Sequence, residues 1–178
     1  MRPLAMSNLS VSTRCLIEWQ LLTLVRPSEA SGARWAEIDL DVNLWTIPAE
    51  RMKAEREHIV PLSLQTLEIL EVMKPISRHL EYIFPSRNDP KQPMNSQTEN
   101  AALKRIGYGG KLVAHGLRSI ASTAMNEAGL NPDVIESALA HSDKNVLRKA
   151  YNRSTYVEKR VELMNWWGME VYKTLGEK

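Results

Sequence analysis

The stretch TRCLIEWQLLTLVRPSE, residues 13–29, carries the first strong structural signal in the chain. Its apolar residues recur at close to the 3.6-residue period of a helix, which predicts a helix with a buried face over residues 13–25. Pro27 disfavours helical angles at the residue before it and is well suited to the first turn of a new helix. The sequence therefore places Arg26 at a corner between two helices.

Two short strands are expected after this corner. The segments LWTIP, residues 44–48, and HIVPL, residues 58–62, are rich in β-branched and aromatic residues, and a charged connection separates them. They predict an antiparallel pair with Lys53 near its turn. This pair is the only sheet that we expect, and it lies near the N-terminal third of the chain.

The remaining segments indicate helices joined by polar loops. We expect further helices over residues 63–75, where Pro75 should end the helix, over 96–107, from about 115, from 131 or 132, and over the tail from 145, with a proline-rich loop over 86–96. No internal repeat is visible. The predicted fold class is α+β and mainly helical, with all 178 residues in one domain.

Composition excludes several classes of protein. Hydrophobic residues make up 43% of the chain and charged residues 25%, and no apolar run approaches the ~20 residues of a membrane span. The N-terminal residues do not resemble a secretory signal, so we expect a cytoplasmic protein without a membrane partner. The single cysteine, Cys15, excludes an internal disulfide. A net charge of only +2 means that a nucleic-acid ligand would need a built site.

The pair His115 and Arg118 suggests such a site. Residues three apart on a helix project together, and the first turn of a helix attracts anions through its unpaired N–H groups. A capping histidine beside a surface arginine would have the same spacing. The H-x-x-R pattern alone therefore indicates phosphate only weakly.

Several other polar residues stand at predicted corners and loops. Two guanidiniums can grip a phosphodiester, a lysine or an imidazole can transfer a proton, and a tyrosine hydroxyl can attack phosphorus. No step in this chemistry needs a cofactor or a metal. We expect no close carboxylate pair of the D-x-D kind, and therefore no two-metal nuclease site. The set comprises Arg26, Lys53, His115, Arg118, His141 and Tyr151.

In order along the chain, five segments resemble the catalytic domain of tyrosine recombinases, specifically prophage integrases of the satellite-phage P4 type. The likeness covers nearly the whole chain, and the ordered motifs are far more specific than any one of them. The segments are TLVRPSEASGARWAEIDLD (23–41), RMKAEREHIVPLS (51–63), IFPSRNDPKQPMN (83–95), AHGLRSIASTAMNEAG (114–129) and LAHSDKNVLRKAYNRSTYVEKRVELMNWW (139–167).

The resemblance implies a role for each residue. It implies that a tyrosine cleaves and rejoins DNA strands through a 3′-phosphotyrosyl intermediate, without metal or ATP, during prophage integration and excision. The double-stranded core of an attachment site would be the partner, bound by a tetramer in the full-length protein. By position, the catalytic residues would be Arg26, Lys53, His115, Arg118, His141 and the nucleophile Tyr151, with Glu29 supporting Arg26.

Three assignments have rivals within the sequence. Lys53 shares its charged turn with Arg51 and Arg56, and Tyr156 follows closely on Tyr151. Glu29 could equally be an ordinary first-turn acid of a helix. His58 is expected to be structural and His79 to be exposed. Trp166 and Trp167 are expected to pack in the core or at a docking face.

The resemblance also implies domains that are not seen here. Integrases of this type carry arm-binding and core-binding domains ahead of the catalytic domain, so we expect the chain to be the C-terminal part of a bacterial, nucleoid-associated enzyme. The fragment alone is expected to be a monomer. Two other functions stay open, a catalytically idle DNA-binding fragment and a ribonuclease that uses histidine and lysine without the tyrosine.

Overall fold

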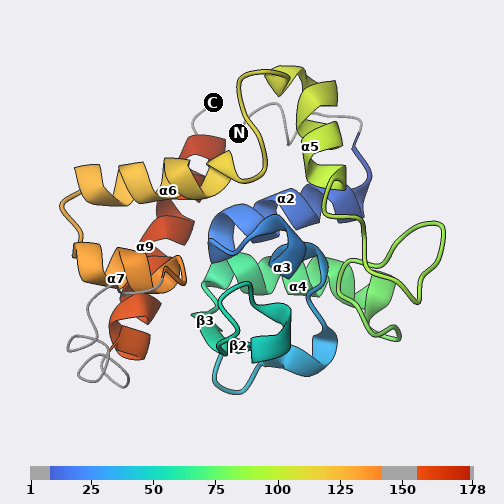
Figure 1. Ribbon diagram of the computed structural model, residues 1–178, viewed down its shortest axis with the longest axis horizontal. Helices are drawn as coiled ribbons and strands as arrows, with labels where there is room; N and C mark the ends of the chain where they lie inside the picture. Colours follow the sequence, from blue (N-terminus) through green and yellow to red (C-terminus); the bar gives the residue numbers. More distant parts are fainter. Residues whose placement is uncertain (1–8, 142–155, 177–178) are drawn as a thin grey trace.

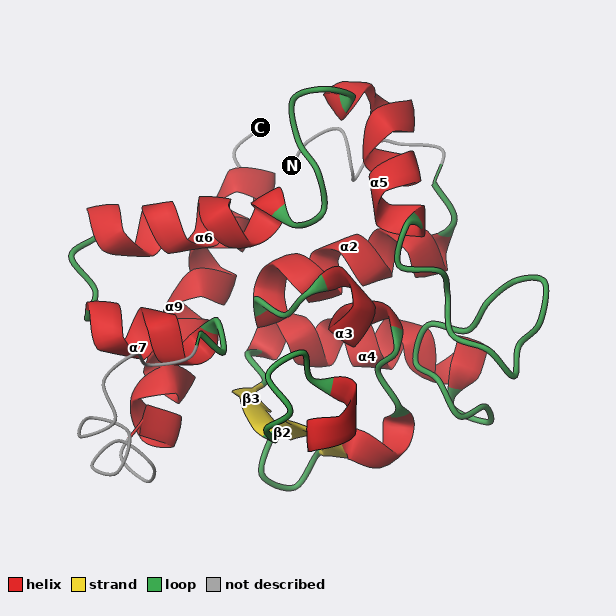
Figure 2. Ribbon diagram, in the orientation of Figure 1, coloured by secondary structure: helices red, strands yellow, loops and turns green. Residues whose placement is uncertain are grey.

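The computed structural model describes residues 9–141 and 156–176 (Figure 1). Within these residues the fold is mainly helical with one small antiparallel sheet (Figure 2), which confirms the predicted fold class. The helices are α2 (Val11–Thr23), α3 (Pro27–Ser31), α4 (Leu64–Ser77), α5 (Thr98–Leu103), α6 (Gly116–Glu127), α7 (Pro132–Ala138) and α9 (Tyr156–Gly176). Shorter turns form η1 (Trp35–Glu37), η2 (Ala49–Arg51) and η3 (Lys104–Tyr108).

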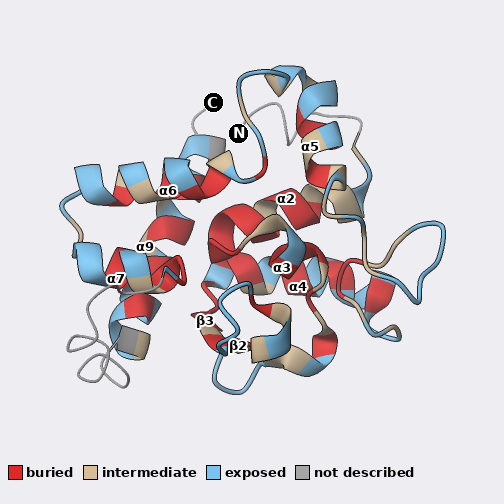
Figure 3. Ribbon diagram, viewed as in Figure 1, coloured by how far each residue is buried: buried red, intermediate tan, exposed pale blue. Residues whose placement is uncertain are grey.

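Helix α2 lies in the middle of the molecule. It begins where the Ser10 hydroxyl accepts a hydrogen bond from the Thr13 amide at 3.3 Å. It ends where Leu24 adopts left-handed angles, with φ of 62°, and its N–H donates to the Gln20 carbonyl. Between these caps the helix packs against α3, α4, α5, α6 and α9, and its C-terminal half is buried almost all round (Figure 3). The predicted helix is confirmed, with an end two residues earlier.

An aromatic cluster joins α2 to the sheet. The ring of Trp19 lies 5.1 Å from that of Trp45 and 6.0 Å from that of Phe84, and all three side chains are fully buried. Tilted rings at these separations place the edge of one against the face of another. The cluster therefore fixes the sheet against the central helix.

The sheet has strand order β1-β2-β3, all antiparallel, with β1 (Ile38–Asp39), β2 (Leu44–Ile47) and β3 (His58–Pro61). Strands β2 and β3 are the two predicted from the sequence. They pair with Trp45 opposite Val60 and end with Ile47 opposite His58. The third strand, β1, was not expected, because two residues are too few to show an alternating pattern.

Helix α9 runs behind α6 and α7 in the view of Figure 1 and packs against α7, α4, β3 and α2. Trp167 is buried in this interface and its indole N–H donates to the Leu21 carbonyl at 2.8 Å. Arg160, also buried, donates from Nη1 to the Ile59 carbonyl at 2.6 Å. The expectation that Trp167 packs is confirmed. No helix among the described residues is long and apolar enough to cross a membrane.

The expectation that Pro75 ends its helix is wrong, because α4 continues to Ser77. A proline removes one hydrogen bond of the helical ladder. Here that loss falls in the last turn, where Ser77 donates its hydroxyl to the Met73 carbonyl at 3.2 Å and the Arg78 amide donates to the Lys74 carbonyl. These bonds hold the final turn despite the proline.

Helix α5 buries an acid. The side chain of Glu99 is fully buried, and neither carboxyl oxygen has a hydrogen-bond partner among the described residues. Burial raises the pKa of this carboxyl to about 9. The acid therefore holds its proton at neutral pH in the folded state and loses it on unfolding.

We expect Glu99→Gln to remove a pH dependence of stability. Because the folded pKa lies above the unfolded one, the folded state binds more protons between them, and stability falls as pH rises through that window. Between pH 7 and 9 the wild-type free energy of unfolding should fall by up to about 1.4 kcal/mol per pH unit relative to Glu99→Gln. Urea unfolding at several pH values measures this difference, and the exposed Glu127→Gln is the control. Parallel curves for wild type and Glu99→Gln would contradict it.

Candidate active site

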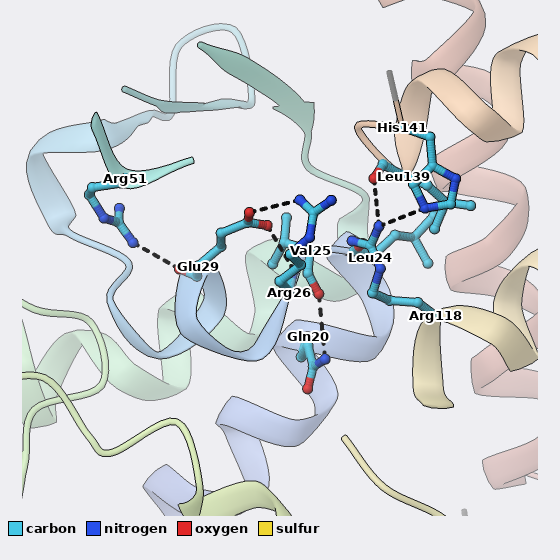
Figure 4. A network of polar contacts seen from close by, with 9 residues as sticks. All are labelled: Gln20, Leu24, Val25, Arg26, Glu29, Arg51, Arg118, Leu139 and His141. Atoms are coloured by element: carbon cyan, nitrogen blue, oxygen red, sulfur yellow. Dashed lines mark hydrogen bonds and ion pairs between the residues drawn. The ribbon is translucent and has the colours of Figure 1, made fainter. Parts of the chain in front are cut away.

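Arg26 occupies the corner that the sequence predicts, as the N-cap of α3. Its backbone N–H donates to Oε2 of Glu29 at 2.8 Å, and its Nη1 donates to Oε1 of the same carboxylate at 3.0 Å (Figure 4). The Glu29 side chain is 1% exposed, whereas that of Arg26 is 21% exposed. The buried carboxylate thus fixes both the backbone and the guanidinium of Arg26, which keeps access to solvent.

Arg118 projects from α6 into the interior and is only 4% exposed. Its Nη1 donates to the Leu24 carbonyl, and its Nη2 donates to the Leu139 carbonyl at 2.6 Å (Figure 4). These carbonyls stand at the C-terminal ends of α2 and α7, where the helix dipole is negative. Burial, the larger cause, and the nearby charge of Arg26 together lower the pKa of Arg118 to about 10. The guanidinium stays charged at neutral pH.

His141 completes this cluster. Its Nε2 lies 3.3 Å from Nη2 of Arg118, and its Nδ1 lies 2.7 Å from Oε2 of Glu136. Arginine can only donate, so the neutral imidazole accepts at Nε2 and carries its proton on Nδ1, facing the Glu136 carboxylate. The ring is about half exposed. It can therefore reach a ligand bound at the surface above Arg118.

The other two predicted residues in the described part of the chain lie on the surface. His115 is exposed immediately before α6, and Lys53 is exposed in the loop between η2 and β3. His115 and Arg118 start the same helix, but one faces solvent and the other the interior, so they do not form the single paired surface that their spacing suggests. Tyr151 lies outside the described residues.

Gln20 is a positioning residue that the sequence analysis missed. Its side chain is fully buried, and Nε2 donates to the Ala114 carbonyl at 3.0 Å and to the Val25 carbonyl at 3.4 Å. These carbonyls belong to the residues before His115 and Arg26. A polar amide within the mostly apolar run WQLLTLV was the only signal for it, and its partner at Ala114 is 94 positions away.

Arg51, one of the two rivals of Lys53 in this turn, bonds within the protein. It forms an ion pair with the Glu37 carboxylate, and its Nη2 donates to the Glu29 carbonyl at 2.8 Å. The Arg51 and Glu37 side chains are 13% and 8% exposed. Arg56, the other rival, is exposed like Lys53. The structure therefore leaves Lys53 and Arg56 as the accessible cations of this turn.

His58 is structural in position, as expected, but lies close to the cluster. It is buried at the start of β3, and its ring bonds to the backbone of Ala138 in α7. Burial lowers the pKa of His58 to about 3, with the charges of Arg160 and Arg118 acting in the same direction. The neutral imidazole thus joins the sheet to the helix that ends beside His141.

Acidic ligands for a metal do not gather in the described residues, where no group of three or more His, Cys, Asp or Glu side chains could hold an ion. The expectation that the chain lacks a D-x-D pair is wrong, because Asp39 and Asp41 form one. This pair lies in the β1–β2 turn, where Oδ1 of Asp39 accepts the Asp41 amide at 3.0 Å. Its carboxylate caps a turn.

Taken together, three segments far apart in sequence supply one cationic cluster of Arg26, Arg118 and His141. Two guanidiniums close enough to depress a pKa repel each other, and a phosphate between them would relieve that repulsion. A neutral Nε2 acceptor on His141 could receive a proton, and a protonated ring could donate one. The cluster is suited to hold a phosphodiester.

Comparisons with known proteins relate the chain to integrases. Residues 3–158 match the model of the phage integrase family. The chain is 63% identical over 167 residues to the prophage integrase IntA of Escherichia coli, covering 94% of this chain and 40% of the relative. It is 41% identical over 173 residues to the integrase of Enterobacteria phage P4, covering 88% and 39%. The chain thus spans about two fifths of the length of these relatives.

Solved structures share the fold. An integrase from mycobacterium phage Brujita superposes with a TM-score of 0.69 at 17% identity, covering 92% of this chain and 54% of that one. A lambda integrase tetramer bound to a Holliday junction gives a TM-score of 0.62 at 18% identity, covering 80% and 44%. At these identities the likeness concerns the fold.

We expect His58→Gln to change how stability depends on pH. The folded pKa of His58 lies below the unfolded value, so the stability that the neutral ring contributes is present above pH ~6.5 and is lost as pH falls toward the folded pKa. Glutamine can still donate to the Ala138 carbonyl but does not titrate. The stability of wild type minus that of His58→Gln should therefore fall by up to about 1.4 kcal/mol per pH unit below 6.5.

Denaturant midpoints at pH 7.5, 6 and 5 measure this difference. His79→Gln, at an exposed position, controls for the loss of a histidine. A pH-independent gap between wild type and His58→Gln would show that the buried ring does not exclude its second proton.

Proposed function

Because the chain belongs to the phage integrase family, we propose that it cuts and rejoins double-stranded DNA by the chemistry of a tyrosine recombinase. One observation carries this proposal. Arg26, Arg118 and His141 come from α3, α6 and the end of α7, yet Arg118 lies 3.3 Å from His141 and feels the charge of Arg26. Such a cluster can bind the non-bridging oxygens of a single phosphodiester.

In the first step, the hydroxyl oxygen of Tyr151 attacks the scissile phosphorus. The bond from phosphorus to the 5′-oxygen breaks as the bond to the tyrosine forms, which gives a 3′-phosphotyrosyl link and a free 5′-hydroxyl. Arg26, Arg118 and His141 stabilise the negative charge that develops on the phosphoryl oxygens. Of these residues, only Tyr151 lies outside the described part of the chain.

Two proton transfers accompany this exchange. His115 accepts the proton of the tyrosine, and Lys53 gives a proton to the leaving 5′-oxygen. Both side chains are exposed, so both are accessible to a duplex at the surface. Removing a general acid or base of this kind costs roughly 10²–10⁴-fold in rate.

The second step reverses the first on a new strand. One phosphoester replaces another of similar energy, so a 5′-hydroxyl from a second duplex can attack the phosphotyrosine and rejoin the strands without ATP. The reaction needs no metal in this scheme. The lambda integrase tetramer bound to a Holliday junction supports a four-subunit assembly on two duplexes for the full-length protein.

We expect Tyr151→Phe to abolish the covalent intermediate. A nicked suicide duplex carrying the core site, incubated in EDTA, should give a protein–DNA band on a denaturing gel with wild type and none with Tyr151→Phe. Tyr156→Phe is the matched control and should retain the band. A band from Tyr151→Phe, or a wild-type reaction that required added Mg²⁺, would contradict the mechanism, and DNA binding without a wild-type band would favour an idle binding fragment.

We expect Lys53→Ala to be rescued by a better leaving group. Replacing the bridging 5′-oxygen with sulfur removes most of the need for a proton on the leaving group, so Lys53→Ala should cleave this substrate at close to the wild-type rate. Arg26→Gln should remain slow on it, because its loss affects the phosphoryl oxygens instead. Single-turnover rates on both substrates measure the effect. Equal losses for Lys53→Ala on oxygen and sulfur would exclude the acid role.

A further inference from the structure

The loop that carries Lys53 is supported mainly at its base, where the η2 turn ends and the Met52 side chain is buried in the core. The last paired residues of the hairpin are Ile47 and His58, so residues 48–57 lie beyond the ladder of β2 and β3. Residues 53–57 are exposed, and Glu55 takes up left-handed angles with φ of 48°. An acid that must reach one oxygen atom needs a firmer support than this loop provides.

Arg51 supplies that support at the base of the loop. Its Nη2 donates to the Glu29 carbonyl at 2.8 Å, and its Nη1 pairs with the Glu37 carboxylate. The loop is thereby joined to α3 and η1, through residues that precede Arg51 by 22 and 14 positions. The carboxylate of Glu29, on the same residue, holds Arg26 (Figure 4).

The neighbours of Arg51 fix its ion-pair partner and leave space for its guanidinium. Glu37 also accepts the indole N–H of Trp45 at 2.9 Å and the Arg34 amide at 3.2 Å, so its carboxylate is held in place by the sheet. Gly32 leaves room for the guanidinium, because a Cβ at this position would lie 2.8 Å from Nη2 of Arg51. The backbone at this position has ordinary angles, with φ of −85°, which any residue could adopt, so only the space for Arg51 favours glycine here.

From these contacts we infer that Arg51 is a positioning residue for Lys53, holding the loop that carries this acid on the same turn, residues 26–29, that holds Arg26. This inference rests on the proposed function, in which Lys53 protonates the leaving oxygen. We assign Arg51 no phosphate contact, because its Nη1 is paired with the Glu37 carboxylate and its Nη2 donates to the Glu29 carbonyl, whereas Arg118 bonds only to backbone carbonyls and an imidazole. The structure thus gives the acid and the phosphate-binding arginine one common support.

Two variants disturb this support by different routes. Arg51→Lys keeps the charge but cannot reach the Glu29 carbonyl and the Glu37 carboxylate with one forked group. Gly32→Ala leaves Arg51 itself unchanged but places a Cβ 2.8 Å from its Nη2 and 3.1 Å from the Ser28 carbonyl, so the guanidinium has to move. Arg34→Lys is the matched control, since Arg34 pairs with Glu81 on the outer side of the same region.

Both variants should slow cleavage of the ordinary nicked duplex, by up to about 10²-fold. The sulfur-substituted duplex should restore most of the lost rate, because a misplaced acid matters little when the leaving group needs no proton. In the double variant Arg51→Lys with Lys53→Ala, the rate should match that of Lys53→Ala alone. Arg34→Lys should cleave both substrates as wild type does.

Losses of equal size on oxygen and sulfur would overturn the inference, because they would show that Arg51 acts through Arg26 or through the fold. An additive double variant would overturn it as well.

A second measurement does not depend on catalysis. Amide hydrogen exchange over residues 52–57 should be faster in Arg51→Lys and Gly32→Ala than in wild type and Arg34→Lys, while exchange in α2 stays the same. Unchanged exchange in this loop would refute the support by Arg51. If instead the wild-type protein formed no covalent product on either duplex, the proposed function would fail while the exchange data still decided whether Arg51 holds the loop.

Discussion

The burial of one cation, Arg118, organises the structure around it. A guanidinium removed from water needs acceptors, and the Leu24 and Leu139 carbonyls provide them at the C-terminal ends of two helices. Those helix ends must therefore meet at one point, which brings the residues that follow them, Arg26 and His141, to either side of Arg118. The need of one buried guanidinium for hydrogen-bond acceptors thus determines where three segments converge.

The same cluster is electrostatically unfavourable when empty. The charge of Arg26 lowers the pKa of Arg118, so the Arg26 guanidinium destabilises the charged form of Arg118. The buried Glu29 carboxylate offsets part of this repulsion and at the same time fixes the direction of Arg26. An anion placed between the two guanidiniums would offset the repulsion that remains. A rigid site of this kind can therefore favour a phosphodiester, although that group carries only one negative charge.

Local signals predicted the elements, and long-range partners escaped prediction. The period of residues 13–25 predicted α2, and β-branched segments predicted β2 and β3, because such patterns are complete within a few residues. Gln20 and Arg51 bond to carbonyls 94 and 22 positions away, and no local pattern records those distances. The catalytic assignments came from a resemblance; the geometry adds the supports of Arg26, Arg118 and His141, and leaves Tyr151 as a prediction.

The packing of α9 against α2 has a consequence for how the protein is made. Trp167 bonds to the Leu21 carbonyl, 146 positions earlier in the chain. At ribosomal rates of ~5–20 residues per second, roughly 7–30 s pass between the synthesis of these two residues. During that interval one apolar side of α2 has no native cover, so the nascent chain offers a surface to chaperones for longer than a protein built from neighbouring contacts would.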